Sequence, residues 1–575
     1  MPNPPTDPTQ FLATLFQAGQ DMLRPYVTPG ADADSTTPAA NPDPFAALAA
    51  TTKALAEMQQ EYIKQMAGMW LALPGLAAMV PGAAPASTDK RFAGAAWQAD
   101  PRFDALTNGY LSYAKFLQSS VEAAAVDDKA KDQLRFAVRQ YVDAMSPANF
   151  LASNPEAIQL ALETGGQSLV EGMGLFFKDA AKGRVSMTDE TAFEVGVNVG
   201  VTPGSVVFEN ELIQLIQYDA KSATVHERPL VIIPPCINKY YILDLTPENS
   251  FVRYAVEQGH TVFMASWRNI TPDQGALTWD DYLQDGVMRA IDVALDITGA
   301  DQVNALGFCI GGTLLASALA VMRTNNAAKV ASATLLTTML DFADPGEIGA
   351  LLSDDSVAQR EKAIGAGGVL EGKDLALAFS SLRANDLIWP YVVNSYLKGK
   401  APPAFDLLYW NSDGTNLPGP MFCWYLRNMY LENNLREPGK TLQCGVPVDL
   451  AEVDMPAFVY ASKEDHIVPW KSAYASTGLL GGDVTFVLGA SGHIAGVVNP
   501  PSKNKRNYWA GGKLGGDPAR WLETAQSVPG SWWPVWSAWL ATHAGARVAA
   551  PKAPGNRKYK RIEPAPGRYV LAKAD

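Results

Sequence analysis

A cysteine between glycines is the first feature of this sequence that could do chemistry. Cys309 stands at the centre of the motif G-F-C-I-G-G, which spans residues 307–312. A strand-like run, residues 302–306, leads into the motif, and a helix-like run of mostly small and apolar residues, 313–320, follows it. Strand, tight glycine turn and helix form the layout of a nucleophile elbow, G-x-S-x-G, here with cysteine in place of serine. We therefore predict that Cys309 is a nucleophile.

The glycines and the helix each have a physical reason. An elbow turns so sharply that neighbouring side chains must be small, which explains Gly307 and Gly311. A helix that begins at the cysteine directs its positive N-terminal dipole at the sulfur and favours the reactive thiolate form. The alternative interpretation is a buried cysteine that only packs beside a glycine-rich turn.

A nucleophilic cysteine needs a base, and in enzymes with this elbow an acid and then a histidine follow along the chain. Three histidines follow Cys309. We choose His493 as the base, because it lies in the glycine-rich loop G-A-S-G-H-I-A-G directly after a strand-like run. Asp465 follows another strand-like run, where the acid is expected. Adjacent side chains diverge, so we expect its neighbour His466 to support the site without acting as the base, and His543 lies near the C-terminus among tryptophans.

Other residues could supply the acid, and the oxyanion hole needs two backbone N–H donors. Asp341 and Asp344 are the competing acids, because some hydrolases take the acid from an earlier strand. Backbone N–H groups hold the negative oxygen that forms during acyl transfer. We expect one N–H from Ile310, the residue after the nucleophile, and the second from Ile237 in the loop P-P-C-I-N-K. Cys236 in the same loop is interpreted as a packing residue.

These side chains need a scaffold, and the pattern from about residue 229 predicts one. Short β-branched or apolar runs alternate with helical segments, as in a mostly parallel sheet covered by helices. A helix over residues 280–298 leads into the strand before the elbow. Together with the elbow, this pattern predicts an α/β protein with an α/β-hydrolase fold. The predicted strands are residues 229–234, 260–267, 302–308, 331–340, 455–462 and 484–488.

Two regions lie outside this alternation. Residues 341–450 are rich in Trp, Tyr and Pro, and we predict that they form a cap insertion over the elbow. Residues 1–200 lack alternating strands and are predicted to form a mainly helical N-terminal domain, followed by a catalytic domain over residues 201–575. Within the N-terminal domain, residues 11–23 carry an apolar helix face that could dock on an apolar surface or pack on the chain's own core.

Composition and charge argue against several classes of protein. The 575 residues include 46 basic and 59 acidic ones, a formal charge of -13, which argues against a nucleic-acid partner. The four cysteines show no C-x-x-C spacing, so we expect no metal site and no disulfide framework, and a reducing cytoplasm fits best. We expect no secretory signal and no transmembrane segment, because the uncharged residues 65–87 contain helix-breaking prolines.

Cysteine in place of serine favours a particular kind of substrate. If the incoming acyl group is a thioester, its transfer to a cysteine thiolate is nearly isoenergetic, and the acyl-enzyme stays activated for a second acceptor. A cap that excludes water then decides whether an alcohol or water attacks next. The sequence thus predicts acyl transfer through a covalent thioester, with a hydroxyl acceptor as a hypothesis.

Four separated motifs allow a comparison with a known family. They are the elbow, P-P-C-I-N-K-Y-Y-I-L-D-L at residues 234–245, E-D-H-I-V-P-W at 464–470 and S-G-H-I-A-G at 491–496. In this order they resemble the poly(3-hydroxyalkanoate) synthases, or polymerases, and the resemblance runs from about residue 100 to the C-terminus. The single long chain and the bulky Phe308 resemble the class I enzymes, which prefer short-chain substrates such as 3-hydroxybutyryl-CoA.

The resemblance implies a role for each candidate residue. Cys309 would carry the acyl group and the growing polyester chain, and His493 would activate its thiol. Asp465 would assist the hydroxyl group of the acceptor, either directly or through His493. No cofactor is implied, because CoA is part of the 3-hydroxyacyl-CoA substrate and is released as a product. The alternative is a cysteine-dependent α/β-hydrolase, either a thioesterase or a lactone hydrolase.

The resemblance also implies partners and a location. Members of the family work as dimers on the surface of intracellular polyester granules, so we expect a homodimer in the cytoplasm, at such granules and with granule-associated proteins. Trp532, Trp536 and Trp539 recur at helical spacing near the C-terminus. They admit two interpretations, packing in the core or facing the polymer.

Overall fold

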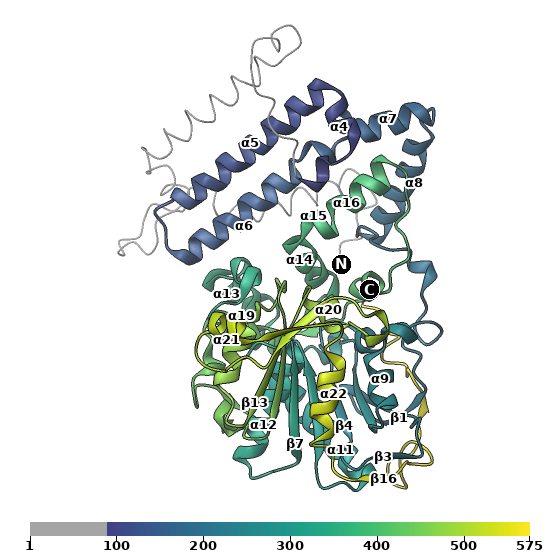
Figure 1. The fold of residues 1–575 in the computed structure, drawn as a ribbon, viewed down its shortest axis with the longest axis vertical. Coiled ribbons are helices and arrows are strands. Elements are labelled where there is room, and N and C mark those ends of the chain that lie inside the picture. The colour runs from purple at the N-terminus through teal and green to yellow at the C-terminus, as the bar shows by residue number, and fades with distance from the viewer. Residues whose placement is uncertain (1–88, 575) are drawn as a thin grey trace. The chain divides into compact units, whose positions relative to one another are not determined.

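The computed structural model describes residues 89–574, which form parts of two compact units (Figure 1). The first unit holds the described residues up to Asp189 together with Phe379–Pro403, and the second holds Glu190–Ala378 and the residues from Ala404 onward. The sequence predicts one boundary at residue 200 and places all of the cap insertion in the catalytic domain. In the structure, the middle of that insertion belongs to the first unit. The predictions for residues 11–23 and 65–87 lie outside the described residues.

The first unit is helical (Figure 1). Its long N-terminal part forms α4 (Ala95–Ala99), α5 (Pro101–Ala123), α6 (Asp128–Ala144), α7 (Pro155–Glu163) and α8 (Gln167–Lys182). Side-chain oxygens of Asp100, Asp127 and Asn154 accept backbone N–H groups at the starts of α5, α6 and α7, as good N-cap residues do. The inserted residues 379–403 add α15 (Ala384–Leu387), α16 (Trp389–Tyr391) and a π-helical turn, Val392–Leu397.

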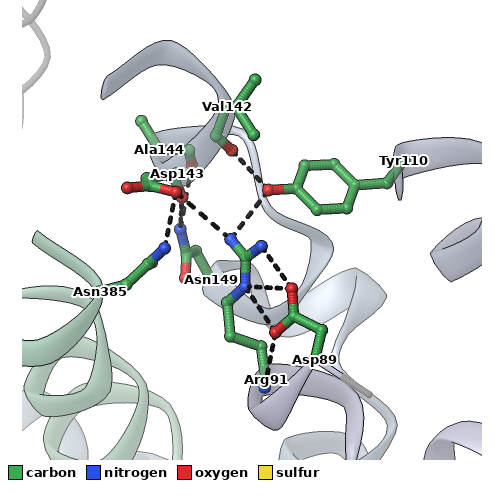
Figure 2. A network of polar contacts seen from close by, with 8 residues as sticks. All are labelled: Asp89, Arg91, Tyr110, Val142, Asp143, Ala144, Asn149 and Asn385. Carbon is green, nitrogen blue, oxygen red and sulfur yellow. Dashed lines mark hydrogen bonds and ion pairs between the residues drawn. The ribbon is translucent and has the colours of Figure 1, made fainter. Parts of the chain in front are cut away.

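Polar contacts join the two segments of this unit. The guanidinium of Arg91 lies 3.6 Å from the carboxylate of Asp143, at the end of α6, and Figure 2 shows the two side chains pointing toward each other. Asn385 of the inserted segment also donates to Asp143, with its Nδ2 2.6 Å from Oδ1 of the carboxylate. Tyr396 donates to Asp179 of α8 at 2.8 Å. Specific hydrogen bonds therefore fix the inserted segment among the N-terminal helices.

The second unit is built on an eleven-stranded sheet in the order β15-β14-β13-β12-β7-β6-β4-β5-β2-β1-β17. The six central strands are parallel: β13 (Val484–Gly489), β12 (Ala457–Ser462), β7 (Val330–Leu336), β6 (Val303–Phe308), β4 (Leu230–Ile233) and β5 (Val262–Trp267). Antiparallel strands extend both edges: β15 (Gln526–Pro529), β14 (Asn507–Ala510), β2 (Ile213–Tyr218), β1 (Gly204–Glu209) and β17 (Glu563–Pro564). The carboxyl ends of the six parallel strands thus meet at one edge of the sheet.

Helices cover both faces of the sheet. On β4, Val231 and Ile233 belong to one hydrophobic cluster, while Leu230 and Ile232 belong to the other, as the alternation of a strand requires. The first cluster includes residues of α11 (Arg289–Thr298) and α12 (Ile310–Thr324), and the second includes residues of α9 (Phe251–Glu257) and α22 (Trp533–Ala541). Other short helices of this unit are α10 (Trp279–Asp281), α17 (Asp406–Asn411), α18 (Gly419–Tyr425), α19 (Trp470–Ala475), α20 (His493–Val497) and α21 (Pro518–Thr524).

The other elements of this unit are short or lie in the cap insertion. The insertion contains α13 (Asp354–Ile364) and α14 (Gly372–Leu382), and the two-residue strands β8 (Val369–Leu370) and β9 (Leu417–Pro418) pair with each other. Two further pairs are β10 (Leu442–Gln443) with β11 (Val446–Pro447) and β3 (Thr224–His226) with β16 (Arg547–Ala549). No helix among residues 89–574 has both the length and the apolar character needed to cross a membrane.

The predicted central strands are present, with one boundary in error. The strand predicted over residues 331–340 ends at Leu336, because Thr337 has a positive φ of 40° and turns the chain. Its N–H instead donates to the carbonyl of Tyr460 at 2.7 Å. The helix predicted over residues 280–298 is present as α10, a π-helical stretch and α11 in succession.

Candidate active site

Cys309 occupies the turn between β6 and α12. Its backbone angles, φ 54° and ψ -127°, lie in a region that residues with a side chain rarely adopt. The N–H of Cys309 donates to the carbonyl of Leu336 on β7 at 2.9 Å, which holds the turn at the end of the sheet. The Cys309 side chain is partly exposed. The structure therefore has the strand, sharp turn and helix expected for an elbow around this cysteine.

Close backbone contacts explain the glycines of the motif. A Cβ atom on Gly307 would collide with the backbone of Gly312. A Cβ atom on Gly311 would collide with the carbonyl groups of Ile233 and Pro234, at the end of β4. Only glycine at position 311 therefore lets the loop after β4 lie against the start of α12.

The two expected oxyanion donors lie on either side of this junction. Ile310 is the first residue of α12, so its N–H takes no part in the helix hydrogen bonds. Ile237 lies in the loop after β4, which is fixed because the Ile237 carbonyl accepts the N–H of Thr415 at 3.0 Å. Its neighbour Cys236 is fully buried, and burial, followed by the charge of Cys309, raises the pKa of the Cys236 thiol. This environment suits the neutral packing residue that the sequence predicts.

His493 and Asp465 form a buried pair at the ends of neighbouring parallel strands. Asp465 follows β12, and His493 is the first residue of α20, just after β13. The Nδ1 atom of His493 lies 2.6 Å from Oδ2 of Asp465, and because a carboxylate only accepts, Nδ1 carries the proton. The Oδ1 atom of Asp465 accepts the N–H groups of Ile467 and Val468, both at 2.9 Å. Asp465 thus fixes the imidazole with Nε2 free to serve Cys309.

The charge state of His493 follows from its neighbours. Burial lowers its pKa, but the negative charge of Asp465, the charge of Cys309 and hydrogen bonds with both residues together raise the pKa to about 10. His493 is therefore protonated at neutral pH. In cysteine–histidine couples, an imidazolium next to the sulfur favours the thiolate, which is the reactive form.

The competing acids are engaged elsewhere. Asp341 accepts a hydrogen bond from Asn433 at 2.8 Å and pairs with Arg436 at 3.2 Å. Asp344 accepts the N–H of Gly346 at 3.2 Å. Asp465 is thus the carboxylate that the structure places on His493.

His466 and two tryptophans lie around the Asp465–His493 pair. His466, next to Asp465, is half-buried. On the other side, Trp532 donates its indole N–H to the carbonyl of Gly496 at 3.0 Å, and Trp533 donates to Val497 at 2.9 Å. These bonds anchor α20, which carries His493.

The three tryptophans predicted to share a helix face lie at and within α22. Trp532 and Trp536 are fully buried, and Trp539 is half-buried against the same hydrophobic cluster. For these residues the structure supports packing in the core.

Two tyrosines near Cys309 were not singled out by the sequence. Tyr430 lies in a π-helical turn, Leu426–Leu431, and burial, then the charge of Cys309, and more weakly that of Asp465, raises the pKa of its phenol. Its ring lies 5.4 Å from that of Tyr425 at 90°, and the two phenols share a hydrogen bond. The only sequence signal was the high aromatic content of the cap insertion, which does not say which ring faces the elbow.

The described residues offer no separate metal centre. Among residues 89–574, no group of three or more His, Cys, Asp or Glu side chains is arranged to hold a metal ion. The side chains and backbone around the elbow supply the sulfur of Cys309, the imidazolium of His493, the carboxylate of Asp465 and backbone N–H groups. Together they can accept an acyl group on sulfur and move a proton at His493 Nε2.

Comparisons with known proteins place this geometry in a family. The family described as "Poly-beta-hydroxybutyrate polymerase (PhaC) N-terminus" matches residues 88–255, and the family described as "alpha/beta hydrolase fold" matches residues 229–500. A poly(3-hydroxyalkanoate) polymerase subunit PhaC from Cupriavidus necator is 53% identical over 540 residues, which cover 92% of this chain and 91% of the relative. The chain belongs to the poly(3-hydroxyalkanoate) polymerase family.

Other members of the polymerase family are also similar over most of their length. A poly(3-hydroxyalkanoate) polymerase subunit PhaC from Rhizobium meliloti is 44% identical over 491 residues, covering 84% of this chain and 80% of the relative. Among solved structures, a monoacylglycerol lipase from Paleococcus ferrophilus has 13% identity and a TM-score of 0.33, covering 58% of this chain and 99% of that chain. The family match and the sheet confirm the predicted α/β-hydrolase fold with a cap insertion and a helical N-terminal part.

Proposed function

We propose that this chain joins (R)-3-hydroxyacyl groups from CoA thioesters into a polyester and releases CoA. The observation that carries the proposal is the arrangement of Cys309, His493 and Asp465 at the elbow. Family membership supports the same activity, because the relatives at 53% and 44% identity are named poly(3-hydroxyalkanoate) polymerases.

In the first step, the sulfur of Cys309 attacks the carbonyl carbon of the acyl-CoA and forms a carbon–sulfur bond. The carbonyl oxygen becomes negative, and the N–H groups of Ile310 and Ile237 stabilise it. As this intermediate collapses, the bond to the sulfur of CoA breaks. The leaving sulfur takes the proton from Nε2 of His493, so CoA departs as a thiol and Cys309 holds the acyl group.

In the second step, the hydroxyl oxygen of a 3-hydroxyacyl group attacks the thioester on Cys309. Nε2 of His493, now neutral, removes the hydroxyl proton, an ester bond forms and the carbon–sulfur bond breaks. This regenerates the ion pair of Cys309 and His493. We propose that Asp465 acts through His493, because its Oδ2 contacts the imidazole and its Oδ1 accepts two backbone N–H groups.

The walls of the site support a short acyl chain and the exclusion of water. Phe308 is fully buried, and its ring stacks on His493 with 5.7 Å between ring centroids. Tyr425 and Tyr430 add aromatic surface from the cap insertion. We propose 3-hydroxybutyryl-CoA as the first substrate to test. If these rings exclude water, attack by a hydroxyl group is favoured over attack by water.

We further propose that the active form is a homodimer that works in the cytoplasm at the surface of polyester granules with granule-associated proteins. This part rests on the family resemblance. Analytical ultracentrifugation with and without substrate tests the dimer, and sedimentation of the chain with isolated polyester granules tests the location. A chain that polymerises as a monomer, or that stays in the supernatant, would contradict the respective part.

The main test is to mix the purified full chain with 3-hydroxybutyryl-CoA, follow thiol release and analyse the acyl product. Release of CoA together with insoluble polyester supports the proposal. Release with only free 3-hydroxybutyrate makes the chain a thioesterase instead. The same assay with Cys309→Ala should show neither thiol release nor polymer, and polymer from that variant would overturn the role of Cys309. A 3-hydroxyoctanoyl-CoA substrate that is used faster would overturn the short-chain preference.

A further inference from the structure

Two histidines that the proposed reaction does not use lie face to face in the second unit. His226 ends β3, and His260 lies just before β5, at the amino end of that strand. Their rings stack with 4.6 Å between centroids and 19° between planes. Cys309 lies at the carboxyl end of the parallel strands, so the histidine pair belongs to the opposite edge of the sheet. It is therefore separate from the proposed active site.

The pair lines a cavity of about 330 Å³, which is within the lower range of small-molecule sites. Every polar side chain in its wall can donate a hydrogen bond, and none of the lining side chains is acidic. The lining residues are His226, Tyr254, Gln258, His260, Pro534, Ser537, Ala538 and Ala541. A wall of this composition favours an anion over a metal ion or an ammonium group.

The ring atoms of His260 are the strongest sign of a ligand. His260 is 1% exposed, and within residues 89–574 neither Nδ1 nor Nε2 has a hydrogen-bond partner. His226 keeps a hydrogen bond with the backbone of Gly545, but its buried Nδ1 has no partner among the described residues. Buried polar atoms in native proteins are normally satisfied, so these three nitrogens call for a bound polar group.

The charges around the pair indicate the sign of that group. Arg547 of β16 lies against Gly259. Burial and then the charge of Arg547 lower the pKa of His226, and burial, then His226 and then Arg547 lower the pKa of His260 to about 3. Two acidic side chains lie on the elements around the pair. Glu227, next to His226, accepts the N–H of Ala546 at 3.3 Å, and Glu257 pairs with Arg253 at 2.8 Å and with Lys221 at 3.9 Å. An anion in the cavity would offset the charge of Arg547 and stabilise a protonated imidazole.

We propose that the cavity between His226, His260 and Ser537 is a binding site for a small oxyanion, either a phosphate or a carboxylate. The oxygens of the anion accept hydrogen bonds from the two imidazoles and from the hydroxyl groups of the wall. Binding takes up a proton on the histidine pair, because a protonated imidazole has two N–H donors and a neutral one has a single donor. The affinity for the anion therefore rises as the pH falls.

The test uses the purified full chain, with inorganic phosphate and acetate as separate probes. Calorimetric titrations in buffers of different ionisation enthalpy, at about pH 6 and about pH 8, measure affinity and proton uptake together. Saturable binding that is tighter at the lower pH and takes up protons supports the site. Phosphate binding without acetate binding, or the reverse, identifies the kind of oxyanion. No saturable binding of either probe overturns the proposal.

Single substitutions test whether the anion binds in this cavity. His260→Gln should weaken binding at least about tenfold, and His226→Gln, at a half-buried position that tolerates change more readily, should do the same. His543→Gln is the matched control, because His543 also lies near the end of α22 but packs on Trp539 and does not line the cavity. Equal affinity in all three variants, or binding of Zn²⁺ in place of either anion, would overturn the proposal.

Discussion

Both carboxylate oxygens of Asp465 are committed, one to Nδ1 of His493 at 2.6 Å and the other to two backbone N–H groups. A carboxylate held in this way cannot turn toward an acceptor hydroxyl without breaking bonds. In the proposed reaction, its effect passes through the orientation and charge of the imidazole.

Replacing Asp465 with Asn should lower kcat by roughly a hundredfold to ten-thousandfold with little change in KM. The amide keeps the shape but removes the charge that holds the His493 imidazolium and its tautomer. Thiol release from 3-hydroxybutyryl-CoA measures both constants. Asp341→Asn is the control, because that carboxylate pairs with Arg436, and equal losses in the two variants would argue against the assignment of Asp465.

The protonation of His493 predicts a pH dependence of stability. Its pKa of about 10 in the folded chain exceeds the ordinary value of 6.5, so the stabilisation is complete below about pH 6.5 and is lost as the pH rises through about 10. The free energy of unfolding should therefore fall with rising pH in this window, with a slope of at most about 1.4 kcal/mol per pH unit from this proton.

Urea unfolding of the parent chain and of His493→Gln at several pH values measures the contribution of this proton to the free energy of unfolding. The difference in unfolding free energy between the two proteins should shrink as the pH approaches 10. A difference that stays constant across the window would mean that His493 is not protonated in the folded chain.

Tyr430→Phe should reduce kcat about tenfold to a hundredfold, because the variant loses a phenol next to the charge of Cys309. The rate of Cys309 alkylation by iodoacetamide should change as well, since the phenol is part of the environment of the sulfur. Tyr474→Phe is the matched control, because the Tyr474 hydroxyl bonds to Gly515 and should affect thermal stability without affecting turnover. Equal kcat values for Tyr430→Phe and the parent would remove Tyr430 from the site.

Gly311→Ala should destabilise the fold by about 1–3 kcal/mol and abolish polymer formation. The added methyl group would push the start of α12 away from Ile233 and Pro234 and displace the Ile310 N–H. Thermal unfolding and the thiol-release assay together test this. Gly516→Ala, at an exposed position with open space around it, should behave like the parent chain.

Asn385→Ala should loosen the helical unit by about 1–2 kcal/mol, because Asp143 loses a hydrogen bond at a partly desolvated carboxylate. Hydrogen–deuterium exchange should become faster in α6 and α15. Asn108→Ala removes only an exposed bond to Asp104 and serves as the control. Unchanged exchange in Asn385→Ala would show that packing alone holds the inserted segment.

The features that sequence reasoning found are local ones. The elbow follows from glycines that a tight turn requires, and His493 and Asp465 follow from their places directly after predicted strands. These signals need no knowledge of distant residues. The roles of the three residues remain predictions until the variants are measured.

The features that it missed depend on contacts between distant residues. Strand β2 carries Gln214 and Gln217, which are fully buried and break the apolar pattern of a strand. Gln214 is tolerated because it donates to Glu209 and to Glu563, and the second partner is 349 positions away in sequence. Tyr430 was missed for the same reason, since only the folded cap insertion brings it to Cys309.

The composition of the helical unit determines what a truncation removes. Its inserted segment, Phe379–Pro403, is encoded within the cap insertion, about two hundred positions after the N-terminal helices end. Deleting everything before Glu190 would leave that segment behind without Asp143, Asp179 and the other groups to which it bonds. Loss of activity in such a truncated protein would therefore reflect damage to the cap insertion as well as loss of the N-terminal helices. In chimeras between relatives, we expect residues 379–403 to require the N-terminal helices of the same parent chain.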